Sequence, residues 1–259
     1  IRSPAYRFGV LEANNVYFEH PSNQLPDDVL FQTTRLFVPS SPPMPEVLAN
    51  LINELDRLCT YGGNESEVIQ CFSAGPLFHD MLPRELCLRI DRKMKRHLIP
   101  SNPTAPYAIP QPRPDLMYGY PLQAFTQKQQ NILKNLHPEI PSYSEACPNL
   151  FFPFFIVEFK VTAGTRGDLW VAGNQCAGGS AACLQAVDQL NAVIREKRCF
   201  GEMPSFCYSL VLDNNLGQVY VSWKDEDYHI QKVASFLLSD PEALTRLFHC
   251  VENILEWGK

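Results

Sequence analysis

Three charged residues at the ends of two apolar segments have the types that metal-dependent phosphodiester chemistry requires. Asp115 follows Pro114 at the start of one segment, and Glu158 and Lys160 lie near the end of the other, residues 151–161. If the segments pair as antiparallel strands, the start of the first lies beside the end of the second. Glu158 and Lys160 are two residues apart and point to the same face. The pattern predicts that Asp115 and Glu158 share one divalent ion, with Lys160 beside it.

The chemistry of such a site follows from its ligands. Mg²⁺ takes one or two carboxylates and completes its shell with waters, and carboxylate and water ligands also suit Mn²⁺. A bound ion lowers the pKa of a water and neutralises charge that builds up on a phosphate. The segment FFPFFIVEFKV is otherwise almost wholly apolar. Two charges at the end of a buried strand need a partner or an ion, and this favours a site.

Simpler interpretations of the same residues stay open. Asp115 after a proline is also typical of a turn in which the side chain bonds its own backbone. Glu158 and Lys160 also fit an exposed ion pair at a strand end. A PD pair and an ExK triplet occur by chance in many chains of this length, so the surrounding elements must support the site.

Hydrophobic periodicity and the positions of glycine and proline predict the elements around these residues. Helices are expected at 45–58, from Asn64 onward, at 83–98 with a basic outer face, at 126–136, at 168–197 and after Ser239 up to Trp257. Strands are expected at 116–120, 151–161, 205–213, 217–223 and 228–233, with loops at 99–114 and 162–167. Asp168 is the expected N-cap of the long helix, and Ser239 with Glu242 is expected to cap the last one. Small residues at 178–182 would let the long helix press closely on a sheet.

The order of these elements predicts a single α/β (α+β) domain over residues 1–259. We expect a mixed central sheet flanked by helices, with an N-terminal helical extension. Residues 1–44 are rich in proline and asparagine, and we expect them to form an arm that packs on the core.

Composition excludes several classes of protein. The 259 residues are 45% hydrophobic and 19% charged, which is ordinary for a globular chain and excludes disorder or coiled coil for its bulk. The longest apolar run, 150–157, is shorter than the ~20 residues that a transmembrane helix needs, so no membrane partner is expected. The net charge of −6 provides no general basic coat for nucleic acid. It argues against a high-affinity DNA-binding module but not against a nuclease, whose metal site is acidic.

The nine cysteines contain no CxxC pair, which argues against a disulfide framework and against a zinc ribbon. We therefore expect a reducing compartment, the nucleus or the cytosol. The first residue is not Met, so a targeting segment ahead of it, and with it secretion, stays open.

Four segments match the pattern of a known group of proteins. They read SPAYR at 3–7, NESEVIQCFSAGPLF at 64–78, PDLMYGY at 114–120 and FFPFFIVEFKVTAGTRGDLWVAGNQCAGGSAAC at 151–183. Together they resemble the PD-(D/E)XK nuclease superfamily and, more narrowly, the fungal PD-(D/E)XK nuclease-like domains. The last segment is the most specific, since it joins the ExK strand to a helix that begins near Asn174-Gln175 and continues in small residues.

The resemblance implies a fold and a set of roles. The fold would be restriction-endonuclease-like, with elements in the order α-β-β-β-α-β. Asp115 and Glu158 would bind the metal and Lys160 would be the catalytic lysine. Glu67, on an early helix, would be a further acidic site residue and metal ligand, although it equally fits a helix cap with Asn64. Gln175 would be a polar site residue, or else it bonds a neighbouring loop.

Two functions of different class follow as expectations. The first is a Mg²⁺- or Mn²⁺-dependent nuclease that hydrolyses phosphodiester bonds, in DNA rather than RNA. The second is a catalytically weak or inactive nuclease-fold domain that binds a protein or a nucleic acid, and an effector-like role for it stays open. A protein partner or a homodimer is compatible with both. Basic residues at 84–96 would line a phosphate groove or simply face solvent.

Overall fold

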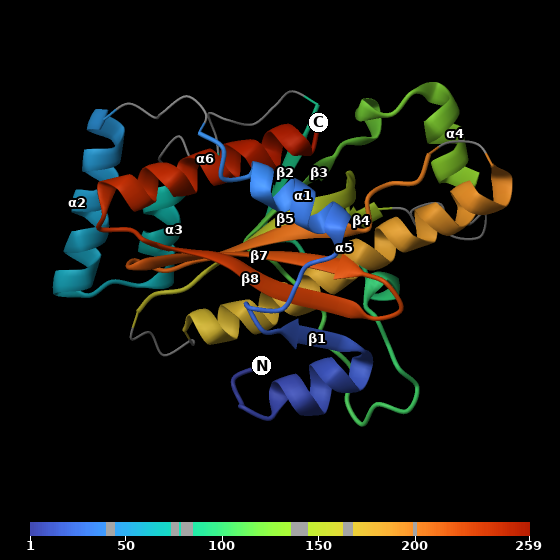
Figure 1. Cartoon of the computed structure of the whole chain (residues 1–259), viewed down its shortest axis with the longest axis horizontal. Helices are drawn as coiled ribbons and strands as arrows, with labels where there is room; N and C mark the ends of the chain where they lie inside the picture. The colour runs from blue at the N-terminus through green and yellow to red at the C-terminus, as the bar shows by residue number, and fades with distance from the viewer. Residues whose placement is uncertain (40–44, 74–77, 79–84, 136–144, 163–167, 199–200) are drawn as a thin grey trace.

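The computed structural model describes residues 1–39, 45–73, 78, 85–135, 145–162, 168–198 and 201–259 (Figure 1). Its helices are α1 (Asp27–Arg35), α2 (Pro45–Tyr61), α3 (Glu65–Ser73), α4 (Gln127–Asn135), α5 (Leu169–Lys197) and α6 (Pro241–Trp257). Its strands are β1 (Val16–Glu19), β2 (Cys87–Ile90), β3 (Leu116–Tyr120), β4 (Glu145–Cys147), β5 (Leu150–Phe159), β6 (Phe206–Leu212), β7 (Leu216–Lys224) and β8 (Tyr228–Leu237). Four short helical turns are η1 (Arg7–Leu11), η2 (Glu12–Asn14), η3 (Arg96–Leu98) and η4 (Leu122–Ala124).

The strands form one mixed sheet of eight, in the order β1-β8-β7-β6-β5-β3-β2, with β4 paired to β5. β3 pairs antiparallel with β2 on one side and with β5 on the other. β6 runs parallel to β5, and α5 makes the crossover between them. The mixed sheet flanked by helices is the architecture that the order of elements predicted.

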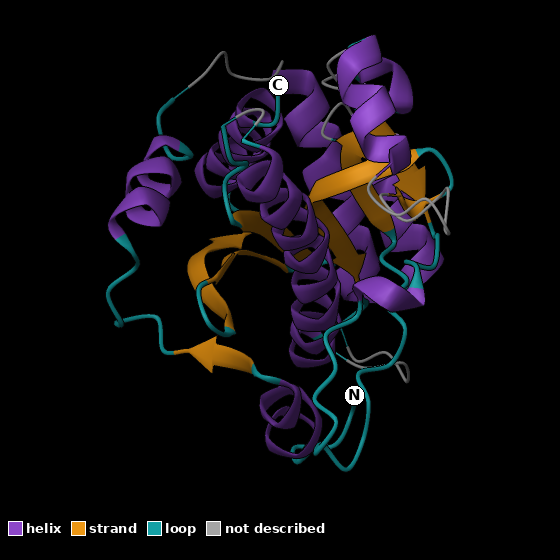
Figure 2. Cartoon of the chain, turned by 90° about the vertical axis from the view of Figure 1, so that its right-hand side faces the viewer, coloured by secondary structure: helices purple, strands orange, loops and turns teal. Residues whose placement is uncertain are grey.

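Helices cover both faces of the sheet and divide the core in two (Figures 1 and 2). On one face, α1, α2, α3 and α6 bury a cluster of aliphatic and aromatic side chains that includes Phe72, Phe159 and Tyr208. On the other face, α5 and the N-terminal turns bury a second cluster around Ile156 and Val211. β5 contributes to both clusters because its alternate side chains point to opposite faces, and all ten of its residues are buried.

Helix α5 lies close to the sheet because its contact face is made of small residues. Asp168 caps it as predicted, and its carboxylate accepts hydrogen bonds from the backbone N–H groups of Trp170 and Val171. A Cβ atom added at Gly179 would lie 2.7 Å from Cδ1 of Ile156 in β5. This close packing compensates for the helix propensity that the glycines lose, about 1 kcal/mol each.

The predicted helix at 83–98 is wrong over its described part, 85–98. Residues 87–90 form strand β2, which pairs with β3, and only a 3₁₀ turn, η3, follows. Leu88 packs against one core cluster and Cys87 against the other, which is the period of a strand. Arg89, expected on a basic helix face, donates hydrogen bonds to the carbonyl oxygens of Pro148 and Asn149. Residues 83–84 lie outside the described residues.

The N-terminal arm does more than pack on the core. β1 adds a parallel edge strand to the sheet beside β8, with Val16 opposite Tyr228. Helix α1 lies over the face of the sheet that α2, α3 and α6 also cover, and it contributes Val29 to the core cluster there.

At the other end of the chain, the cap of α6 is Asp240, whose carboxylate accepts from the N–H of Glu242. The prediction of Ser239 as that cap is wrong by one residue, because Pro241 occupies the first position of the helix.

Gly119 fills a position in β3 that admits no side chain. The register between β3 and β5 shifts here, from Tyr118 opposite Phe155 to Tyr120 opposite Phe151. A Cβ at Gly119 would lie 2.7 Å from the carbonyl oxygen of Phe151, a backbone atom that cannot move aside. We expect Gly119→Ala to lower the free energy of unfolding by about 1–3 kcal/mol.

Urea denaturation measures the effect of Gly119→Ala, and Gly9→Ala is its control, because a Cβ at Gly9 meets no atom within 4 Å. An equal loss in both variants, or none in Gly119→Ala, would contradict the close approach of β3 and β5.

In the described ranges of the chain, no helix combines the length and apolar character needed to cross a membrane.

Candidate functional site

The pairing of β3 with β5 brings together the two carboxylates that the sequence analysis selected. Leu116 lies opposite Val157 in the antiparallel register, so Asp115 and Glu158 are the next pair along the two strands. Directly opposite residues of neighbouring strands project to the same face. The predicted antiparallel pairing is confirmed, and with it the placement of the two acids side by side.

Glu158 is a charged group in an almost fully enclosed position. Its residue is only 2% exposed, and no hydrogen bond from any described residue reaches its carboxylate. Burial raises its pKa well above the ordinary value of 4.5, and the adjacent Asp115 raises it further, while Lys160 opposes both effects. Burial therefore disfavours the charged form of Glu158 in the folded protein.

Asp115 is held in place by the backbone of the strand opposite. Its Oδ2 accepts a hydrogen bond of 2.7 Å from the N–H of Phe159. Burial raises the pKa of Asp115, and the bond from Phe159 and the charge of Lys160 oppose that shift. The interpretation of Asp115 as a turn residue bonded to its own backbone is therefore not what the structure shows, since the bond crosses to β5.

Lys160 is as deeply buried as Glu158, with 4% of its residue exposed. Its ammonium group donates to the carbonyl oxygen of Phe159 at 2.6 Å and lies 3.6 Å from Oε2 of Glu65. Lys160 thus contacts an acid on α3, and its charge also opposes the rise in the pKa of Asp115 and Glu158 on the sheet. An exposed ion pair at a strand end, the alternative for Glu158 and Lys160, does not fit their burial.

The loop after Lys160 is fastened to the neighbouring β6–β7 turn. The N–H of Lys160 donates to the carbonyl oxygen of Leu212 at 2.8 Å. The N–H of Thr162 donates to Oδ1 of Asn214, and its hydroxyl donates to Asp213. The carboxyl end of β5 is therefore held on both sides, by β3 through Asp115 and by this turn.

The early-helix acid that reaches the site is Glu65, two residues before the predicted one. Glu67 closes a capping box: its Oε2 accepts from the N–H of Asn64 at 2.8 Å, and its own N–H donates to Oδ1 of Asn64 at 3.2 Å. Its carboxylate is therefore occupied at the start of α3. Both acids lie in the first turn of one helix, so spacing in the sequence could not distinguish the cap from the site.

Gln175 lies in the first part of α5 and is half-buried. Its neighbours in the chain have contacts of their own, since Asn174 accepts from Arg7 at 2.8 Å and the buried thiol of Cys176 has its pKa raised by burial and by the charge of Glu158. Cys176 therefore lies closer to the acidic pair than its apolar setting in the sequence suggested. No described contact joins Gln175 to Asp115, Glu158 or Lys160.

Asp91 is a fourth acid near the site that sequence reasoning missed. It follows β2, its N–H donates to the carbonyl oxygen of Asp115 at 2.9 Å, and its charge raises the pKa of both Asp115 and Glu158. Its Oδ2 pairs with Arg113 at 2.6 Å, which offsets that charge. The error over the 83–98 helix concealed it, because a helix would not have ended beside β3.

Asp115 and Glu158 are the two carboxylates that could hold a divalent ion. Among the described residues, no group of three or more histidine, cysteine or acidic side chains is placed to hold a metal ion. Mg²⁺ does not require one, because one or two carboxylates with waters satisfy it. The buried carboxylate of Glu158, without a described hydrogen-bond donor, is the kind of group that such an ion neutralises.

Mutation of Glu65 and of Glu67 should have different effects, because Glu65 contacts Lys160 of the site and Glu67 caps its own helix. Glu65→Gln should lower activity at the site by roughly 10- to 100-fold, as loss of a supporting partner does. Glu67→Ala should leave activity intact and cost about 1 kcal/mol of stability, the usual value of a cap. Thermal unfolding of both variants, with the rate of the metal-dependent hydrolysis that the sequence predicts, measures this, and a reversed order would return Glu67 to the site.

The comparisons with known proteins place the chain without assigning an activity. The family described as "Domain of unknown function (DUF7924)" matches residues 81–259. The matched region contains Asp115, Glu158 and Lys160, whereas Glu65 on α3 lies before it. No curated protein matches the chain. Since the match covers more than half of the 259 residues, the chain belongs to this family of unknown function.

Proposed function

We propose that this protein is a divalent-metal-dependent nuclease of the PD-(D/E)XK type. One observation carries the proposal: a glutamate that is 2% exposed and a lysine that is 4% exposed lie at the end of one strand, beside an aspartate on the next. Burying two carboxylates and an ammonium group costs several kcal/mol per ion unless strong partners offset it. A core strand kept only for stability has no need of these charges.

The arrangement of the core elements supports the same proposal. α3, β2, β3, β5, α5 and β6 follow one another in the order α-β-β-β-α-β that a restriction-endonuclease-like core has, with β4 and α4 inserted between β3 and β5. β3 lies between β2 and β5 and is antiparallel to both, and β6 is parallel to β5. The three site residues Asp115, Glu158 and Lys160 lie at one end of the two central strands of this core.

Each side chain has a role in the proposed hydrolysis. Asp115 and Glu158 would hold Mg²⁺ or Mn²⁺, which supplies an acidified water and offsets charge on the phosphate. Asp115 is already oriented by the N–H of Phe159 and has its second oxygen free of described bonds. The ammonium group of Lys160 is held by the carbonyl oxygen of Phe159 and by the carboxylate of Glu65. It would orient the attacking water or stabilise the pentavalent phosphorus. Glu65 is a positioning residue that acts through Lys160.

DNA is the substrate that we favour, with RNA as an arm of the test. The net charge of −6 indicates weak contacts with the phosphate backbone outside the site. Arg195, on the long helix α5, is a candidate contact for the phosphate backbone, but its guanidinium already pairs with Glu202 at 2.7 Å. Arg166, another candidate, lies outside the described residues. We therefore expect weak substrate binding and slow cleavage, with a shallow dependence on salt because few phosphate contacts are made.

A cleavage panel tests the proposed function. Purified protein is incubated with supercoiled, linear and single-stranded DNA and with RNA, in Mg²⁺, in Mn²⁺ and in EDTA. We expect cutting of DNA that requires the metal and stops in EDTA. A folded protein whose melting temperature rises with Mg²⁺ but which cuts none of the substrates would overturn the nuclease and favour the second function, a nuclease-fold binding module.

A further inference from the structure

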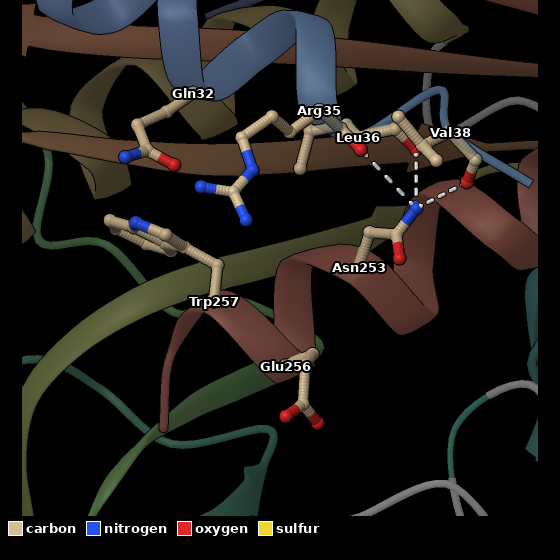
Figure 3. Close-up of a pocket in the computed structure, with 7 residues that line it drawn as sticks. All are labelled: Gln32, Arg35, Leu36, Val38, Asn253, Glu256 and Trp257. Carbon is tan, nitrogen blue, oxygen red and sulfur yellow. Dashed lines mark hydrogen bonds between the residues drawn. The ribbon is translucent and has the colours of Figure 1, made fainter. Parts of the chain in front are cut away.

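A second concave region lies between α1 and α6, away from the acidic site. It encloses about 370 Å³, within the size of small-ligand pockets (Figure 3). Its lining comes from the last turn of α1, the residues after it and the last turns of α6: Gln32, Arg35, Leu36, Val38, Asn253, Glu256 and Trp257. None of these residues contacts Asp115, Glu158 or Lys160, so the pocket is separate from the proposed nuclease site.

The walls of the pocket are joined by one side chain. The Asn253 amide donates to the carbonyl oxygens of Leu36 at 3.0 Å and Val38 at 2.8 Å, and at 3.4 Å to that of Arg35 (Figure 3). These carbonyls follow the end of α1, where the helix has no further N–H groups to offer. Asn253 therefore holds α1 at a fixed position on α6, and the pocket is formed before any ligand arrives.

Arg35 presents a positive charge without an acidic partner among the described residues. Its guanidinium lies 5.7 Å from the centre of the Phe31 ring, and the structure pairs it with no carboxylate in those ranges. The one acid in the lining, Glu256, pairs with Lys259 at 2.7 Å and points away from the guanidinium (Figure 3). The charge of Arg35 is therefore available to an anion.

Trp257 provides a flat apolar surface opposite that charge. Its ring stacks on Phe206 with centroids 4.9 Å apart, and it makes edge contacts with Tyr208 at 5.2 Å and with Phe154 at 5.8 Å. In Figure 3 the indole lies across the cavity from the ends of Gln32 and Arg35, both of which point toward it. A planar ring stacked on Trp257 would lie in the same cavity as the amide of Gln32, which offers a hydrogen-bond donor and an acceptor.

We propose that this pocket binds one nucleotide unit, with the base stacked on Trp257 and the phosphate on Arg35. Stacking of bases on aromatic side chains tolerates any base, and the planar guanidinium of arginine suits a phosphate. The amide of Gln32 faces the base edge. The unit comes either as a free mononucleotide or as an unpaired nucleotide of a strand, and binding does not require the nuclease proposal to hold.

Calorimetric titration of the intact protein in EDTA tests the pocket without cleavage. The probes are adenosine 5′-monophosphate, adenosine, inorganic phosphate and a single-stranded octanucleotide. We expect the mononucleotide to bind at least tenfold more tightly than adenosine or phosphate alone. A further gain for the octanucleotide would identify a strand as the source, and no gain would identify a free nucleotide.

Variants locate the binding. Arg35→Gln should weaken the mononucleotide at least tenfold, and Trp257→Leu should weaken it more than Trp257→Phe, which keeps a ring. Arg57→Gln, at an exposed arginine on α2, is the matched control. Glu158→Gln should bind as the wild type does, which separates this pocket from the nuclease site. Binding unchanged by Arg35→Gln, or no binding of any nucleotide probe by the folded protein, would overturn the proposal.

Discussion

Replacing Lys160 with methionine is expected to lower metal-dependent cleavage by roughly 10²–10³-fold, the usual cost of removing one preorganised charge from a transition state. Lys160 is the buried cation beside Glu158 and Asp115, and its ammonium group is held by the Phe159 carbonyl and Glu65. Methionine keeps an unbranched chain of similar length, so the apolar packing of the stem is preserved. The loss should therefore fall on the rate of hydrolysis rather than on substrate binding.

Single-turnover cleavage of the substrate found in the panel measures this loss. Lys93→Met is the control, because Lys93 is exposed and follows β2 outside the site. Thermal unfolding must accompany the assay, since Lys160→Met leaves Glu65 and Glu158 without their cation. A rate equal to that of the wild type in a folded Lys160→Met variant would place the activity elsewhere, or in a contaminant.

Replacing Glu158 with glutamine is expected to stabilise the metal-free protein at pH 8 while abolishing its response to Mg²⁺. Burial, and then the charge of Asp115, raise the pKa of Glu158 well above its ordinary 4.5. Between that value and the raised one, the folded protein binds a proton that the unfolded chain has lost. The free energy of unfolding therefore falls as the pH rises through this interval and changes no further above it. Glutamine has no such titration.

Thermal unfolding from pH 4.5 to 8.5, in EDTA and in excess Mg²⁺, measures both effects. The wild type should lose stability with rising pH in EDTA, and the variant should lose less, since Asp115 still titrates with a raised pKa. An ion at 100 times its dissociation constant adds about 2.7 kcal/mol to the wild type, at roughly 2–4 °C per kcal/mol.

The control for this experiment is Glu256→Gln, at an exposed acid on α6 that should alter neither effect. A Mg²⁺ shift that survives in Glu158→Gln would show that the ion binds elsewhere. A wild type whose stability in EDTA is flat from pH 4.5 to 8.5 would contradict the burial of an unpaired Glu158.

Much of the strand and helix pattern could be predicted because local signals and tertiary packing agree there. The strand at 116–120, the hairpin around residue 214 and the cap at Asp168 all form as expected. The structure of the segment at 83–98 could not be predicted from the sequence, because its basic residues are compatible with a helix face. Only pairing with β3 makes residues 87–90 a strand. The same holds for residues 1–39, where β1 gains its partner from β8, more than two hundred residues later in the chain.

For the candidate site, residue type and strand order were sufficient to select Asp115, Glu158 and Lys160, since a charge in an apolar strand is visible in the sequence. Which acid accompanies Lys160 was decided by tertiary structure, because Glu65 and Glu67 share one helical turn and only docking of α3 determines which of them meets the lysine. Asp91 enters for the same reason, through the register of β2. The pocket between α1 and α6 has no signal in the sequence at all, since Arg35 and Trp257 become neighbours only when the two ends of the chain fold together.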